Sequence, residues 1–249
     1  MKNLKNYILQ IADNNLILGQ RLSELCGHGP SLETDIACTN IALDLLGQTR
    51  SYYQYAASLE NDDVTEDDLA YQRTEREYKN VLLVEYPNKH FGYIIMRQFL
   101  FDVFHQLFLT ELLSSKDEQL AAIARKGIKE ANYHVSFSGD WIKRLGDGTQ
   151  ESHEKVQEAL DALWSYTGEL FDPSEYEKQL IEEGIAVNLE KIKPIYLERV
   201  SKLFAEATLT IPETKWFKKG GKQGVHTEHM GYILADLQYM QRTYPNMSW

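Results

Sequence analysis

The sequence has few of the residues that cross-link a chain or interrupt a helix. Only 2 of its 249 residues are cysteine, too few for a disulfide framework or a thiolate metal site and typical of a reducing cytosol. It has 6 prolines, so long helices can run without interruption. It also lacks an apolar run free of charge: the most apolar stretch, 91–113, contains Arg97, Asp102, His105 and Glu111. Charged groups are costly in hydrocarbon, so we interpret this stretch as a core helix.

Basic residues are outnumbered by acidic ones, 26 to 37, which gives a formal net charge of −11. The resulting field repels nucleic acid and anionic membrane surfaces, so we expect neither as a partner. No export signal is visible, because polar residues at 10, 13, 14 and 15 interrupt the apolar residues near the N-terminus. We therefore expect a cytoplasmic protein. With 43% hydrophobic residues, we expect one compact domain over 1–249.

Apolar residues recur at helical spacing along most of the chain, and no segment alternates as a half-buried strand does. Glycine and proline mark the ends of several helices. The sequence therefore predicts an all-α fold, in which long helices form a four-helix-bundle core and further helices follow towards the C-terminus. The predicted helices cover about 4–25, 31–59, 69–84, 91–114, 117–145, 152–170, 174–183, a longer helix ending near 209 that Pro194 opens or kinks, and 227–244.

Carboxylates on four of these helices follow the order found in di-iron bundles, where lone carboxylates alternate along the chain with carboxylate-plus-histidine pairs. The matching residues are Asp44, Glu75, Asp102 and Glu130. Glu75, however, is followed by Tyr78 at the third position and Lys79 at the fourth. A half-site without its histidine, and with a lysine beside the carboxylate, is poorly suited to iron.

Two interpretations of these residues remain open. One is a self-sufficient di-metal oxidase, in which Asp102 pairs with His105 and Glu130 with His134, although this places both histidine motifs on consecutive helices. The other is a degenerate site without metal, a buried polar network in which nearby cations such as Arg73, Arg76 and Lys79 balance the acids. The network would contain Asp44, Glu75, Asp102, His105, Glu130 and His134.

The segment 215–222 holds four lysines and two aromatic residues in an otherwise acidic chain. Glycines beside lysines can hold phosphate, so Lys218, Lys219 and Lys222 are candidates for contact with a phosphate-bearing ligand. The alternative is a basic loop that docks on an acidic partner or on the protein itself. His226 and His229 could bind a metal from one helical turn, but no third ligand is evident. We favour a helix start at this point, with Thr227 as N-cap.

Four stretches together resemble the PaaC family, the structural subunits of the ring 1,2-phenylacetyl-CoA epoxidase. They are Cys-Gly-His-Gly-Pro at 26–30, Asn-Ile-Ala-Leu-Asp-Leu-Leu-Gly-Gln at 40–48, Ile-Lys-Glu-Ala-Asn-Tyr-His at 128–134, and the ending 220–242, with Gly-Gly-Lys, His-Thr-Glu-His and Gln-Tyr-Met-Gln-Arg. The similarity extends over essentially the whole chain.

The resemblance implies a ferritin-like helical fold and a structural role in a monooxygenase complex of aerobic phenylacetate degradation. The expected partner is PaaA, the related catalytic subunit, which carries the di-iron centre and binds phenylacetyl-CoA. With such a substrate, Lys218, Lys219 and Lys222 become candidates for contact with the phosphates of coenzyme A or with a partner. Other expected components are a small subunit and a reductase that passes electrons from NADPH through flavin and an iron–sulfur cluster. The resemblance implies no iron ligand, cofactor or catalytic residue in this chain. It leaves open whether the chain alone forms a homodimer.

Overall fold

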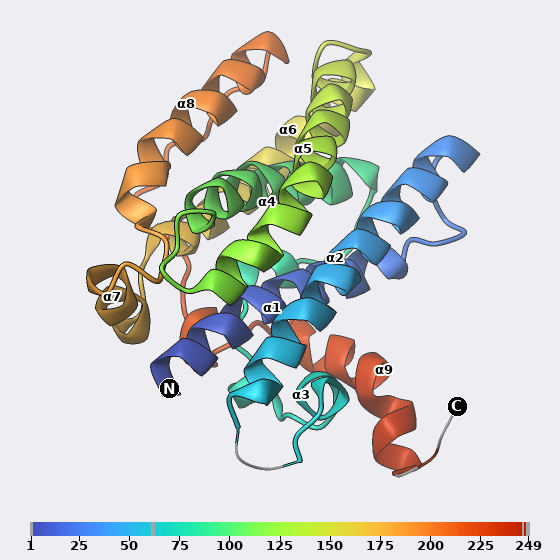
Figure 1. Ribbon diagram of the computed structural model, residues 1–249. Coiled ribbons are helices and arrows are strands. Elements are labelled where there is room, and N and C mark those ends of the chain that lie inside the picture. Colours follow the sequence, from blue (N-terminus) through green and yellow to red (C-terminus); the bar gives the residue numbers. More distant parts are fainter. Residues whose placement is uncertain (1, 61–62, 246, 248–249) are drawn as a thin grey trace. The chain divides into compact units, whose positions relative to one another are not determined.

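The computed structural model describes residues 2–60, 63–245 and 247. These residues form helices and connecting segments and contain no strand, so the predicted all-α class is confirmed (Figure 1). Close contacts divide the chain into two compact units, the first formed by 1–85 with 220–249 and the second by 86–219. One domain over 1–249 stays a prediction.

The first unit is built on two long helices, α1 (Lys2–Ser23) and α2 (Leu32–Ser58), which pack along one another. Ser31 caps α2 by accepting a hydrogen bond from the Thr34 amide. Shorter elements follow: α3 (Glu66–Tyr71) and the 3₁₀ turns η1 (Glu75–Glu77) and η2 (Leu82–Glu85). The C-terminal part of the chain adds the turn η4 (Gly221–Gln223) and α9 (Glu228–Thr243).

The prediction of a continuous helix over 69–84 is wrong. Helix α3 ends at Tyr71, and Thr74 begins a new turn by forming a capping box with Glu77. Arg73 between them is buried and binds a carboxylate on α1. Turn chemistry and this long-range ion pair therefore override the helical pattern of the segment.

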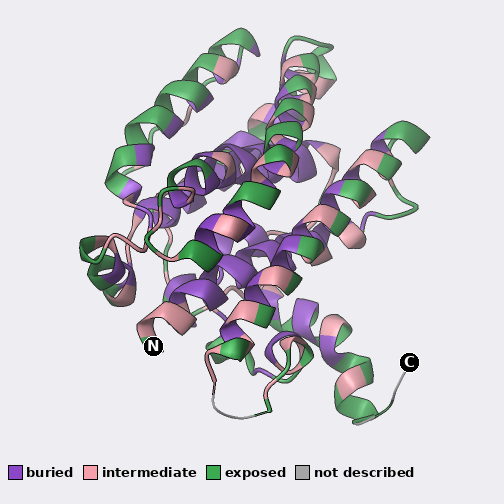
Figure 2. Cartoon of the chain, in the orientation of Figure 1, coloured by how far each residue is buried: buried purple, intermediate pink, exposed green. Residues whose placement is uncertain are grey.

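The second unit contains the long pair α4 (Phe91–Leu112) and α5 (Glu118–Gly146), followed by α6 (Gln150–Leu163), the 3₁₀ segment η3 (Trp164–Phe171), α7 (Glu175–Glu182) and α8 (Leu189–Glu206). Most of α4 is buried (Figure 2), because α5, α6 and α8 all pack against it. Pro194 lies within α8. The helix predicted over 152–170 is α-helical only to Leu163, because the 3₁₀ segment η3 follows it. The two long helix pairs are consistent with a ferritin-like bundle.

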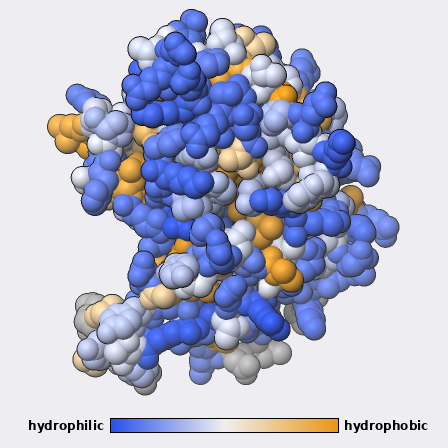
Figure 3. Space-filling model, turned by 180° about the vertical axis from the view of Figure 1, so that it is seen from behind, coloured by the Kyte–Doolittle hydropathy of each residue, from blue (hydrophilic) through white to orange (hydrophobic). Residues whose placement is uncertain are grey.

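The surface carries exposed apolar residues in addition to this core. On the face turned to the viewer in Figure 3, hydrophilic residues predominate and hydrophobic ones occur in small separate groups. Such scattered residues are normal for a folded chain. No helix in the described part of the chain is both long enough and apolar enough to cross a bilayer.

Candidate functional site

The six residues of the predicted site do not share one environment. In the first unit, Asp44 on α2 is half-buried and Glu75 on η1 is exposed. In the second unit, Glu130 on α5 is half-buried, whereas Asp102, His105 and His134 are almost fully buried. The prediction of a buried network of six is therefore wrong for Glu75. Its place on a 3₁₀ turn, which the sequence did not reveal, turns that side chain to solvent.

A smaller buried cluster remains in the second unit around Asp102 of α4. Its carboxylate accepts hydrogen bonds from Gln98 Nε2 at 2.6 Å and from Ser138 Oγ at 2.8 Å. Ser138 Oγ also lies 2.8 Å from the backbone oxygen of His134. The ring of His105 stacks on Phe101, with 5.4 Å between the centroids. The helical spacing that suggested a metal site thus brings three of the six residues together.

Electrostatics in this cluster disfavour charge. Burial raises the pKa of Asp102 to about 6, although the neighbouring His134 and the hydrogen bonds from Ser138 and Gln98 lower it. Burial, together with the neighbouring His134, lowers the pKa of His105 to about 3. At neutral pH His105 is therefore uncharged, whereas Asp102 takes up a proton only below about pH 6.

These donors do not fit a di-iron centre. Such a centre needs several carboxylates and histidines converging on one space, but both oxygens of Asp102 already accept hydrogen bonds from protein donors. The described residues contain no group of three or more histidine, cysteine, aspartate or glutamate side chains arranged to hold a metal ion. The geometry supports a hydrogen-bonded structural cluster.

An ion pair that the sequence did not predict lies in the first unit. Arg73 donates to both oxygens of Asp13 on α1, at 2.5 and 3.0 Å, and Tyr53 Oη donates to the same carboxylate at 2.6 Å. The backbone amide of Lys79 adds a further donor at 2.8 Å. Arg73 was expected to balance a nearby acid, and it does supply a countercharge, but to a residue 60 positions away.

A second unexpected pair joins η2 to the residues that precede α9. Glu85 is fully buried, and one of its oxygens lies 2.6 Å from His226 Nδ1 while the other accepts from the Thr227 amide and hydroxyl at 2.8 and 2.6 Å. His226 Nε2 lies 3.0 Å from the backbone oxygen of Tyr78. Because a carbonyl can only accept, Nε2 carries a proton, and the carboxylate favours a second proton on Nδ1.

Burial opposes the positive charge of His226, but the hydrogen bond and the charge of Glu85 outweigh it and raise the pKa of the imidazole. Thr227 is the N-cap of α9, as predicted, and accepts from the His229 amide at 3.3 Å. His226 is thus held in an ion pair, which leaves no ring nitrogen for the metal site considered from the sequence.

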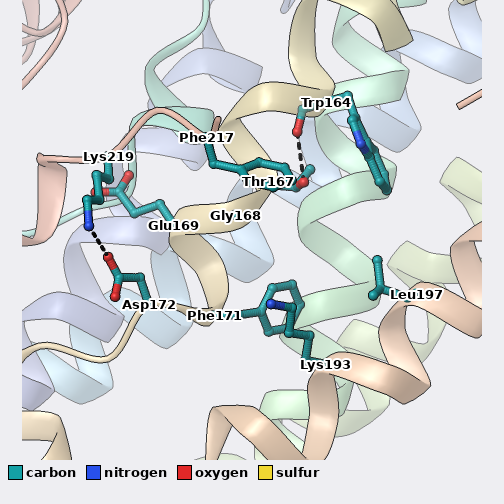
Figure 4. A pocket seen from close by; sticks show the side chains of 10 residues that line it. All are labelled: Trp164, Thr167, Gly168, Glu169, Phe171, Asp172, Lys193, Leu197, Phe217 and Lys219. Atoms are coloured by element: carbon teal, nitrogen blue, oxygen red, sulfur yellow. Dashed lines mark hydrogen bonds and ion pairs between the residues drawn. The ribbon is translucent and has the colours of Figure 1, made fainter. Parts of the chain in front are cut away.

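The three candidate lysines of segment 215–222, Lys218, Lys219 and Lys222, differ in exposure. The Lys218 ammonium donates to Tyr166 Oη at 2.9 Å and lies 4.3 Å from the centre of that ring. Lys222 is only 3% exposed. Lys219 is exposed and pairs with Asp172 at 3.2 Å (Figure 4). Phosphate binding by these lysines stays a prediction, with Lys219 the most accessible of them.

Comparison with known proteins agrees with this fold. The whole chain, residues 1–249, matches the model of a family described as phenylacetic acid catabolic protein. The chain belongs to this family. One relative, from Escherichia coli strain K12, is named as the C subunit of 1,2-phenylacetyl-CoA epoxidase. It is 48% identical over 249 residues, which span the full length of both chains.

The resemblance to the PaaC family is thereby confirmed, and it was visible in the sequence. The two buried ion pairs were not visible in the sequence, although one signal pointed to the pair of Asp13 and Arg73. Asp13 interrupts the apolar positions of α1 and is fully buried, and a buried acid on such a stripe requires a partner. Nothing local to Glu85 or His226 indicated their pairing.

Proposed function

We propose that this chain is a structural, non-catalytic subunit of a multicomponent 1,2-phenylacetyl-CoA epoxidase in aerobic phenylacetate degradation. The observation that carries this proposal is the full-length relation to the C subunit of that enzyme in Escherichia coli. The proposed partner is a PaaA-type catalytic subunit that holds the di-iron centre and binds phenylacetyl-CoA. A small subunit and a reductase with flavin and an iron–sulfur cluster complete the proposed complex, which acts in the cytoplasm.

The donor chemistry of the chain supports a non-catalytic role. Glu75 faces solvent, and the acid buried at position 102 is occupied by hydrogen bonds from Gln98 and Ser138. A self-sufficient di-metal oxidase would need these groups free to converge on metal. That alternative is not favoured, and the iron would belong to the partner.

One face of α2 offers a contact surface for the catalytic partner. Leu32, Ile36 and Leu43 are 72%, 51% and 60% exposed, and their spacing places them on the same side of the helix. Three large apolar side chains on one side of a helix, all more than half exposed, form a face that another protein can cover. Burying them against a partner helix would remove that apolar area from water and hold the two subunits together.

The test is co-expression with the catalytic subunit of the same organism, followed by size-exclusion chromatography and epoxidase assay. We expect a stable complex, and we expect the catalytic subunit alone to lose activity or solubility. Replacing Ile36 and Leu43 together by glutamate should weaken the complex by about tenfold or more, because charge is then placed in an apolar interface. Tyr239→Glu, at an exposed position of α9, is the control for a charge placed on an exposed apolar residue elsewhere.

The proposal fails if no complex forms and the catalytic subunit is equally active and soluble alone. Iron analysis of the freshly purified chain separates the alternative oxidase from the structural role. A self-sufficient di-metal enzyme would contain about two irons per chain, whereas a structural subunit would contain close to none.

A further inference from the structure

A pocket of about 600 Å³ opens within the second unit between η3, α8 and segment 217–219 (Figure 4). Its apolar wall is formed by Trp164 and Phe171 of η3, Leu197 of α8 and Phe217. Pockets of a few hundred cubic ångströms with mainly apolar and aromatic walls are typical of small-molecule sites. Nothing in the proposed structural role uses this space.

The wall that carries Phe217 is held in place. The Lys218 backbone amide donates to the backbone carbonyl oxygen of Ser165 at 2.9 Å, and the Lys218 ammonium donates to Tyr166 Oη. Gly168 leaves room for the Phe217 ring, since a Cβ at that position would lie 2.3 Å from Phe217 Cγ. The pocket is therefore preformed, and a ligand would not need to order this segment.

The charges at the pocket favour one anionic group on a ligand. Lys193 of α8 is exposed and has no ion-pair partner among the described residues. Lys219 pairs with Asp172, but both side chains are largely exposed, and such pairs are weak enough for a ligand to compete. Glu169 also lines the pocket but is only 2% exposed. Lys193 is thus the lining cation that an incoming anion can neutralise without displacing another partner.

We propose that this pocket binds small aromatic carboxylates. The flat ring lies against the aromatic side chains of Trp164, Phe171 and Phe217, where offset and edge contacts between rings add to apolar burial. The carboxylate pairs with Lys193 at the opening. This binding is separate from assembly with a catalytic subunit and does not depend on it.

The test is isothermal titration calorimetry of the full-length chain with 1-naphthylacetate and its neutral analogue 1-naphthylacetamide. The carboxylate should bind about fivefold more tightly than the amide, which is the effect of one partly exposed charge pair. Lys193→Gln should abolish this preference. Lys191→Gln, which removes a charge from the same helix outside the pocket lining, should retain it. Phe217→Ala should weaken both ligands, because an aromatic wall is lost.

Equal affinity for the two ligands in the unchanged chain would overturn the proposal, as would the absence of binding at millimolar concentration. Loss of the preference in Lys191→Gln to the same extent as in Lys193→Gln would show a general charge effect and would also overturn it. Lys193 is exposed, so its variant should fold, and the result does not depend on the stability of Phe217→Ala.

Discussion

In the first unit, Asp13 and Glu85 are each fully buried beside a cationic side chain, Arg73 for one and His226 for the other. In the second unit, Asp102 is equally buried but receives its hydrogen bonds from the neutral groups of Gln98 and Ser138. A buried carboxylate is costly unless it is paired or neutralised. The first unit pairs its acids with cations, whereas the acid of the second unit becomes neutral by taking up a proton below about pH 6.

The difference has a structural consequence. Each ion pair of the first unit joins segments that are far apart in sequence, α1 with the turn after α3 and η2 with the start of α9. Breaking such a pair leaves a buried charge without compensation. The cluster around Asp102 joins α4 to α5 through one hydroxyl, and its acid can take up a proton. We therefore expect the first unit to depend on its acids far more than the second.

The largest effect is expected from Arg73→Met, which removes the countercharge and leaves Asp13 buried. Loss of one partner of a buried ion pair costs about 3–5 kcal/mol. The free energy of unfolding, measured by urea denaturation, should fall by that amount. Combining the change with Asp13→Asn should recover part of the loss, because no buried charge then remains.

Arg76→Met is the matched control, because Arg76 is exposed three residues away and its loss should change stability by less than about 0.5 kcal/mol. Equal effects of the two arginine changes would show that the pair with Asp13 does not hold the first unit together.

A smaller and pH-dependent effect is expected from His226→Gln. The variant keeps a donor but loses the charge opposite Glu85. Its free energy of unfolding near pH 6 should therefore be lower by about 1–3 kcal/mol. The folded-state pKa of His226 is raised, so its contribution is complete below the unfolded pKa and is lost as pH rises through the folded pKa. Urea denaturation between pH 6 and pH 9 should show that the difference in free energy of unfolding between the native chain and the variant becomes smaller as pH rises. A constant difference would contradict a charged His226.

Much of the helical fold could be predicted because long amphipathic helices carry their own signal. The helices predicted at about 4–25, 31–59 and 91–114 lie at Lys2–Ser23, Leu32–Ser58 and Phe91–Leu112. The prediction of a helix over 69–84 failed because a capping box and a buried arginine leave no trace in the spacing of apolar residues. Tertiary contacts decided its structure.

The candidate site was predictable only where its residues share a helix or neighbouring helices. Spacing along α4 and α5 identified Asp102, His105 and His134, which the fold does bring into one buried region. Spacing could not connect Glu85 to His226, which are 141 residues apart. A single sequence contains no local pattern for a contact of that kind.

The smallest effect, and the sharpest contrast with Arg73→Met, is expected from Asp102→Asn. An amide of the same shape can accept from Gln98 and donate to Ser138, whose hydroxyl can turn to the His134 oxygen 2.8 Å away. Replacing a buried polar group by one that keeps its partners is close to neutral. We expect the free energy of unfolding to change by less than about 1 kcal/mol at pH 4, where the native carboxyl is already protonated.

The raised pKa of Asp102 sets the sign of its pH dependence. The pKa of Asp102 is raised from 3.8 to about 6 on folding, so its stabilising contribution is complete below pH 3.8 and is lost as pH rises through 6. The variant has no such loss and should match or exceed the native chain at pH 7. Burial lowers the pKa of His105 to about 3, a contribution of opposite sign that is present in both proteins and cancels. Asp140→Asn, an exposed change on α5, should show no comparable trend. A strongly destabilised Asp102→Asn at pH 7 would mean that the second unit, like the first, depends on a buried charge.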